Sequence, residues 1–167
     1  MFNIGDTVVT SNGVCQIEKI GPLAGMGKSA AGKEYYTLKP YFDNGGKIYI
    51  PVAGQDEAMR FALSKEEVNE LVNEIKDLDQ INISDEKQRE AEYKSAVNSK
   101  DPRRLIRIIK TMYFRRKQRV ESGKKSTAID ERYFRIAETR LYDEMALALE
   151  LDRDEVKEYV RAKIEKR

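Results

Sequence analysis

The sequence of 167 residues has no histidine, no tryptophan and a single cysteine, Cys15. Without histidine the chain lacks the most common general base of enzymes and can form neither a Ser-His nor a Cys-His nucleophile pair. A lone cysteine also excludes a disulfide framework and leaves no reasonable set of zinc ligands. Since no arrangement of carboxylates or lysines replaces these groups, the sequence predicts a protein that is not an enzyme and has no metal or cofactor.

Long apolar runs are missing as well. A membrane-spanning helix needs about 18 or more consecutive apolar residues, and no such run occurs. The opening MFNIGDTVV lacks the basic and then apolar layout of a secretory signal. We therefore expect a cytoplasmic protein with no membrane contact, in which Cys15 packs in a strand and has a structural role.

Residues 1–60 have the composition of a small β domain. They contain nine of the ten glycines and three of the four prolines. Short β-branched stretches predict strands at residues 7–9, 14–20, 35–39 and 47–52, with hairpin turns at 12–13 and 43–46 and a loop at 21–33. Four or five short antiparallel strands predict an SH3-like or Tudor-like barrel. Its six basic and six acidic residues leave it neutral, which favours protein contact over phosphate binding.

Residues 61–167 change to a helical period. Ser64 and Glu67 form a capping box for a helix that continues to about residue 78. A weaker helix is predicted at 85–98, and Asp101 with Pro102 begins a third that continues to about residue 120. Two more helices follow residues 127 and 152. The sequence thus predicts an α+β protein with segregated parts, a barrel domain at 1–60 and a bundle of about five helices at 61–167.

Residues 102–125 concentrate the positive charge of the chain. They hold ten basic residues against one acid, a formal charge of +9 in a chain whose total is +2. Helical spacing places an apolar face from Leu105 to Tyr113 and puts Phe114 among the basic residues of the opposite, solvent-facing side. The predicted DNA-binding residues are Arg103, Arg104, Arg107, Lys110, Arg115, Arg116, Lys117, Lys124 and Lys125.

Two interpretations of this basic helix stay open. The first is a surface for nucleic acid or another polyanion, which we favour because the charge continues past the helix to Lys124 and Lys125. The second is a solvated face whose cations pair with the acidic segments around it, since residues 61–101 carry eleven acids against six bases.

Two further stretches of the sequence bear on ligand and partner binding. Gly27-Lys28-Ser29 has the wrong spacing for a phosphate-binding loop and precedes a strand rather than a helix, so no small-molecule site is predicted. The strand that begins near Lys47 has side chains of alternating character and ends at Pro51. A proline at this place favours the edge of a sheet. Such an edge is either protected from pairing or used by a partner strand, and composition alone favours protection.

Together these residues resemble the CarD/CdnL family of bacterial transcription regulators, whose barrel is shared with the RNA-polymerase-interacting domain of transcription-repair coupling factors. The resemblance begins with Gly5-Asp6-Thr7-Val8-Val9 and Gly13-Val14 and continues through Tyr36-Thr37-Leu38-Lys39 and the strand that ends at Pro51. Further on it includes the helix at 64–78, the basic helix, residues 127–141 and Asp143-Glu144-Met145-Ala146-Leu147-Ala148.

The resemblance implies a non-enzymatic regulator, acting as a monomer, that reaches the nucleoid through RNA polymerase. Its barrel would bind the polymerase β subunit, partly by strand addition, and its helical domain would contact promoter DNA without reading sequence and stabilise the open complex. The implied polymerase-binding residues are Leu23, Lys47, Ile48, Tyr49 and Ile50. The alternative is an adaptor whose basic helix meets an acidic protein surface and no DNA.

Three departures from the family pattern stand out. Thr10-Ser11-Asn12 replaces the family's Tyr-Pro-x-His, and Leu23 and Tyr49 fall near arginines that contact polymerase in some relatives. The tryptophan that many relatives wedge into the minor groove would fall near Asp85-Glu86. Because an acid there repels phosphate, we expect backbone binding rather than a wedge.

Overall fold

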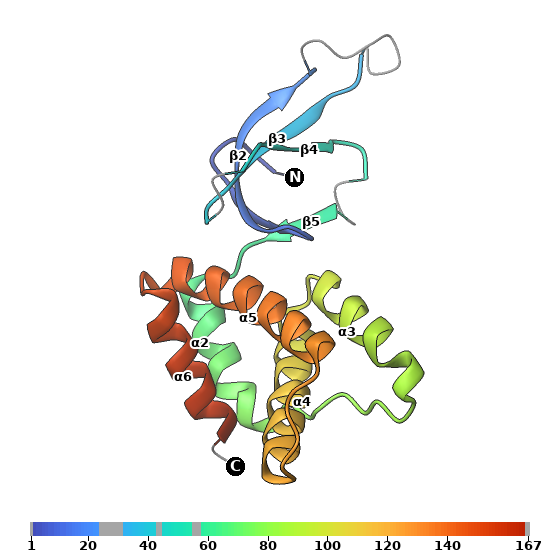
Figure 1. Ribbon diagram of the computed structural model, residues 1–167. Coiled ribbons are helices and arrows are strands. Elements are labelled where there is room, and N and C mark those ends of the chain that lie inside the picture. The colour runs from blue at the N-terminus through green and yellow to red at the C-terminus, as the bar shows by residue number, and fades with distance from the viewer. Residues whose placement is uncertain (1, 24–31, 43–44, 55–57, 166–167) are drawn as a thin grey trace. The chain divides into compact units, whose positions relative to one another are not determined.

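The computed structural model describes residues 2–23, 32–42, 45–54 and 58–165. The chain divides into two compact units, Met1–Ala62 and Leu63–Arg167. The first is an antiparallel sheet curled into a half-barrel and the second is built from helices, which confirms the predicted α+β class (Figure 1). Among the described residues no helix combines the length and apolar character that crossing a bilayer requires.

The described part of the first unit forms one five-stranded sheet. Its strands are β1 (Thr7–Thr10), β2 (Gly13–Gly21), β3 (Tyr35–Pro40), β4 (Ile48–Pro51) and β5 (Met59–Phe61). Their order is β4-β3-β2-β1-β5, with every neighbouring pair antiparallel. The location of β5 was not predicted, because three residues are too few to show an alternating pattern.

The turn between β1 and β2 confirms the predicted hairpin at Asn12-Gly13. Thr10 pairs with Gly13 across a two-residue loop, and Gly13 has a φ of 104°, which disfavours a side chain there. The predicted loop at 21–33 and turn at 43–46 lie partly outside the described residues, and Gly27-Lys28-Ser29 lies wholly outside them.

The barrel has its own apolar core. Val8, Cys15 and Leu38 are completely buried there. Burial raises the pKa of the Cys15 thiol, which keeps it protonated and unreactive near neutral pH and agrees with a structural role.

The second unit contains helices α2 (Lys65–Glu74), α3 (Arg89–Asn98), α4 (Pro102–Glu121), α5 (Ala128–Leu149) and α6 (Arg153–Glu165). Short 3₁₀ turns at Ile75–Asp77 and Glu86–Gln88 precede an α3 that begins four residues later than predicted. Both hydrogen bonds of the predicted Ser64–Glu67 capping box are present. Asp101 caps α4, accepting a hydrogen bond from the Arg103 N–H at 3.0 Å.

The apolar face of α4 forms the centre of the helical core. Leu105, Ile106, Ile108, Ile109 and Met112 are buried against α2, α3, α5 and α6, and Phe114 packs partly against the same core. The expectation that Lys110 faces solvent is wrong, since the residue is 7% exposed. This placement changes how the basic helix must be interpreted.

Candidate functional site

Strand β4 forms one edge of the described sheet, because it pairs with β3 and with no other strand there. The Val52 N–H donates to the Glu34 carbonyl at 3.0 Å. Since hydrogen-bonded and non-hydrogen-bonded pairs alternate along an antiparallel ladder, Ile50 and Ile48 bond to β3. The backbone groups of Tyr49 therefore face the open edge, where a partner strand could pair with them.

The side chains of β4 alternate between two faces. Ile48 and Ile50 pack against the barrel core, whereas Tyr49 is 51% exposed on the opposite face. On that face a hollow of about 560 Å³ brings together three of the predicted polymerase-binding residues, Leu23, Lys47 and Tyr49. The predicted residues thus occupy one edge, three on its outer face and two beneath it.

The remaining walls of this hollow were missed by the sequence analysis. They are Lys19, Pro22, Tyr35 and Thr37. The strand register explains the grouping, since Lys19 pairs with Thr37 and Thr37 pairs with Tyr49, so that one row crosses three strands. The row depends on a bulge in β2 between Ile17 and Lys19, which no sequence pattern indicates.

Lys47 is held in place by Glu18, the residue at that bulge. The Lys47 Nζ lies 2.8 Å from a Glu18 carboxylate oxygen. This hydrogen bond lowers the pKa of Glu18 and raises the pKa of Lys47, so both stay charged and largely cancel each other near neutral pH. The hollow therefore presents apolar and aromatic surface together with the charge of Lys19.

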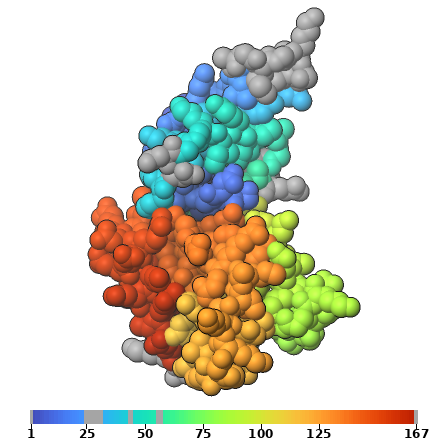
Figure 2. All heavy atoms as spheres, viewed as in Figure 1, coloured from blue at the N-terminus to red at the C-terminus, as the bar shows by residue number. Residues whose placement is uncertain are grey.

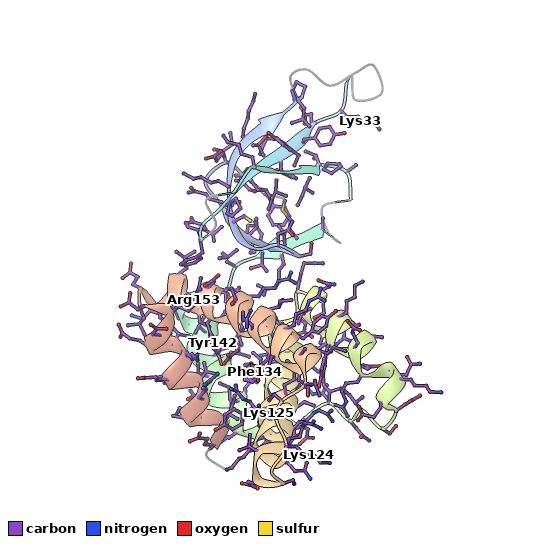
Figure 3. The ribbon with its side chains drawn as sticks, in the orientation of Figure 1. Lys33, Lys124, Lys125, Phe134, Tyr142 and Arg153 are labelled. Carbon is purple, nitrogen blue, oxygen red and sulfur yellow. The ribbon has the colours of Figure 1, made fainter. Side chains whose placement is uncertain are left out.

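Three arginines of α4 are paired with carboxylates of the same unit. Arg103 holds Glu74 with two hydrogen bonds of 2.7 and 2.8 Å, and this contact lowers the pKa of Glu74. Arg115 contacts Asp130 at 2.8 Å and Glu86 at 3.4 Å. Arg116 lies 3.4 Å from Glu131 and above the ring of Phe134 (labelled in Figure 3).

Three more predicted DNA-binding residues bond to uncharged groups. Lys110 donates to the carbonyls of Ile75 and Leu78, each at 2.6 Å. Arg107 donates to the Asp79 carbonyl at 3.0 Å, and Arg104 to Ser95 Oγ at 2.7 Å. Arg107 and Lys110 thereby fasten the extended segment after α2 along α4, a structural role that the sequence analysis did not predict.

The remaining three predicted residues, Lys117, Lys124 and Lys125, are exposed and have no carboxylate partner among the described residues. Arg119 extends the group, with its Nε donating to the Lys125 carbonyl at 2.9 Å. Lys124 and Lys125 follow the C-terminal end of α4 (Figure 3). The surface of α4 and the first part of α5 forms a continuous yellow-to-orange region (Figure 2). We call Lys117, Arg119, Lys124 and Lys125 the cationic end of α4.

Residues 2–62 match the model of the CarD-like/TRCF RID domain family. The match spans the half-barrel, including β4 and the hollow beside it. The half-barrel is therefore similar to CarD-like/TRCF RID domains. This confirms the resemblance over the first unit. The CarD-like domain is a protein-interaction domain rather than an enzyme family, and its name as an RNA-polymerase-interacting domain implies a polymerase partner. No curated protein matches the chain significantly.

Proposed function

We propose that this protein is a transcription regulator that binds the β subunit of RNA polymerase through its barrel and promoter DNA through its helical unit. It acts as a monomer, in the cytoplasm, on the nucleoid-bound polymerase, and modulates the stability of the open promoter complex. The observation that most directly supports this proposal is that β4 lies at an exposed edge of the described sheet, within the residues that match the CarD-like/TRCF RID domain family.

The open edge supports strand addition as the mode of polymerase binding. A partner strand beside β4 gains main-chain hydrogen bonds at Tyr49, and its alternate side chains enter the hollow of Leu23, Lys47 and Tyr49. Because Glu18 neutralises Lys47, contacts in this hollow combine apolar area with the charge of Lys19.

DNA contact is proposed for the cationic end of α4 rather than for the whole helix. Cations that already bond to Glu74, Glu86, Asp130 or Glu131 gain little by moving to a phosphate, since the carboxylate would be left unpaired. The exposed lysines of the cationic end carry no such cost. Phosphate contacts position a protein on DNA without reading sequence, so promoter choice comes from polymerase.

The same pairing gives a specific argument for a second candidate function. If the acids of the helical unit neutralise enough of α4, the protein is an adaptor that binds polymerase and a further acidic protein, without DNA contact. Footprinting on promoter DNA with polymerase present separates the two functions, because only the regulator extends the protected region.

Capture of polymerase from lysate, with and without nuclease, tests the proposal. We expect polymerase to be retained after nuclease treatment, since the barrel binds it directly, and promoter DNA to be lost. Capture that disappears with nuclease would contradict the polymerase half of the proposal. A footprint unchanged by the protein would contradict the DNA half.

A further inference from the structure

Beside α4 lies a hollow of about 450 Å³ that the proposed function does not use. Its walls come from the extended segment before α3, from the start of α3 and from one face of α4. The lining residues are Gln80, Ile81, Asn82, Ile83, Arg89, Thr111, Phe114, Arg115 and Gln118. Phe114 also lines two neighbouring hollows of about 310 and 370 Å³, so its ring stands where all three meet.

The hollow is built by the fastening of the extended segment. Arg107 holds the Asp79 carbonyl, and Thr111 Oγ1 accepts from the Ile81 N–H at 2.8 Å. Further along the same face of α4, at the spacing of successive turns, come Phe114 and Gln118. The extended segment and the face of α4 that line the hollow are therefore held together before any ligand binds, which lowers the entropic cost of binding.

The chemistry of the lining is that of nucleobase recognition. Phe114 lines the hollow while the edge-to-face contact of its ring with Tyr113, at a centroid distance of 5.4 Å, holds the ring in place. Stacking on an aromatic ring contributes roughly 1–3 kcal/mol per base in single-strand binding proteins. Gln80, Asn82 and Gln118 are exposed, and their side chains make no hydrogen bond with other described residues. Each amide can donate and accept, as the edge of a base requires.

The charge balance argues against a ligand that is mostly phosphate. Arg89 contacts Glu86 at 2.7 Å, and Arg115 contacts Glu86 and Asp130, so two carboxylates oppose the two guanidinium groups. Phosphates of a free nucleotide would have to displace these carboxylates. A base within a strand does not, because its phosphates can reach Lys117 in the adjoining hollow.

We propose that this hollow binds an unpaired base of a DNA strand, with the base stacked on Phe114 and its edge hydrogen-bonded to Gln118 and Gln80. The proposal rests on the proposed function, in which the helical unit lies at promoter DNA. It extends that function from duplex to melted DNA, since only an unpaired base can enter the hollow.

Fluorescence anisotropy with two labelled strands tests this inference on the full chain. One strand is a short oligothymidine, and the other has the same length and phosphates but abasic sugars. We expect the wild type to bind the oligothymidine about tenfold more tightly, the preference that stacking of one base supplies. Phe114→Leu and Gln118→Ala should reduce this preference to about two- to threefold or less.

The control variant is Tyr159→Leu, which removes an exposed aromatic ring from α6 outside the hollow. It should keep the preference. Gln118→Ala changes an exposed residue, so it tests the inference even if Phe114→Leu lowers stability. Equal binding of both strands by the wild type, an undiminished preference in both variants, or competition by free thymidine monophosphate as strong as by the strand would overturn it.

The two proposals can fail separately. If the wild type binds polymerase and promoter DNA but shows no preference for bases over abasic sugars, only the base site is wrong. If the preference is present and polymerase does not associate, the base site stands and the proposed function is wrong.

Discussion

Lys110 is the residue whose role differs most between sequence and structure. Helical spacing places it among the cations of α4, yet it is buried and donates to the carbonyls of Ile75 and Leu78. A lysine can do this because its apolar stem packs against the core while its ammonium group reaches polar atoms at the end. The position of the segment after α2, which packs beside α4, decides the role of Lys110; no local sequence pattern does.

Replacing Lys110 with methionine should destabilise the helical unit by about 2 kcal/mol. The variant keeps the apolar stem of the side chain. It removes the ammonium group, so the largely buried carbonyls of Ile75 and Leu78 lose a hydrogen-bond donor. The free energy of unfolding by urea is the measurement. The matched control is Lys117→Met on the exposed part of the same helix, which should change stability by less than about 0.5 kcal/mol. Equal effects of the two substitutions would contradict the buried role of Lys110.

Tyr93 gives a second residue-scale prediction, in the alkaline range. Its hydroxyl donates to Asp130 Oδ1 at 2.7 Å, and burial, more than this bond, raises its pKa to about 12. The folded state therefore keeps the proton while the unfolded state releases it near pH 10. The stability that this proton contributes is complete below about pH 10 and is lost as the pH rises toward 12.

The variant Tyr93→Phe should thus be less stable than the wild type by about 1.5 kcal/mol at about pH 8, the cost of a lost hydrogen bond to a charged acceptor. The difference should shrink between about pH 10 and 11, because only the wild type carries the titrating hydroxyl. The free energy of unfolding by urea, measured for the wild type and the variant at about pH 8 and about pH 11, gives this difference. A difference that stays constant would show that Tyr93 does not titrate in this way.

At the scale of elements, local patterns predicted much of the secondary structure. Capping at Ser64 and Asp101, the Asn12-Gly13 hairpin and the apolar face of α4 each depend on residues within a few positions of one another. The ion pairs of the arginines, in contrast, join residues that lie far apart in the sequence. Arg103 and Glu74 are 29 residues apart, and their contact exists only after α2 and α4 pack together. The same limit explains why the hollow around Phe114 was not predicted.

The DNA-binding element should be the cationic end of α4. If Lys117, Lys124 and Lys125 each neutralise a phosphate, replacing all three with glutamine should make the slope of log affinity against log salt less negative by about 3. Fluorescence anisotropy with duplex promoter DNA over a range of salt concentrations measures the slope. The control is Arg103→Gln, which removes a cation already paired with Glu74 and should change the slope by less than about one. A larger change of slope in Arg103→Gln than in the triple variant would contradict this prediction and would indicate that DNA binds at the start of α4.

For the whole molecule, the distribution of charge is the reason that the proposed function uses two contacts. Residues through Ala62 carry six basic and six acidic side chains, so the remaining residues sum to the total of +2. A helical unit with so small a net charge attracts DNA only weakly at a distance. Under the proposed function, binding of the barrel to polymerase would raise the local concentration of DNA around the cationic end, which is the benefit of a tethered second contact.

The central claim is that β4 accepts a strand of polymerase at its open edge. Tyr49→Pro tests it directly, because its N–H faces that edge and its loss leaves the hydrogen bonds to β3 in place. Tyr49→Thr is the control, since it removes the ring and keeps the N–H. Affinity for nuclease-treated core polymerase should fall by about a hundredfold or more in Tyr49→Pro and by only about tenfold in Tyr49→Thr. Equal affinity of the proline and threonine variants, with both barrels folded, would contradict strand addition.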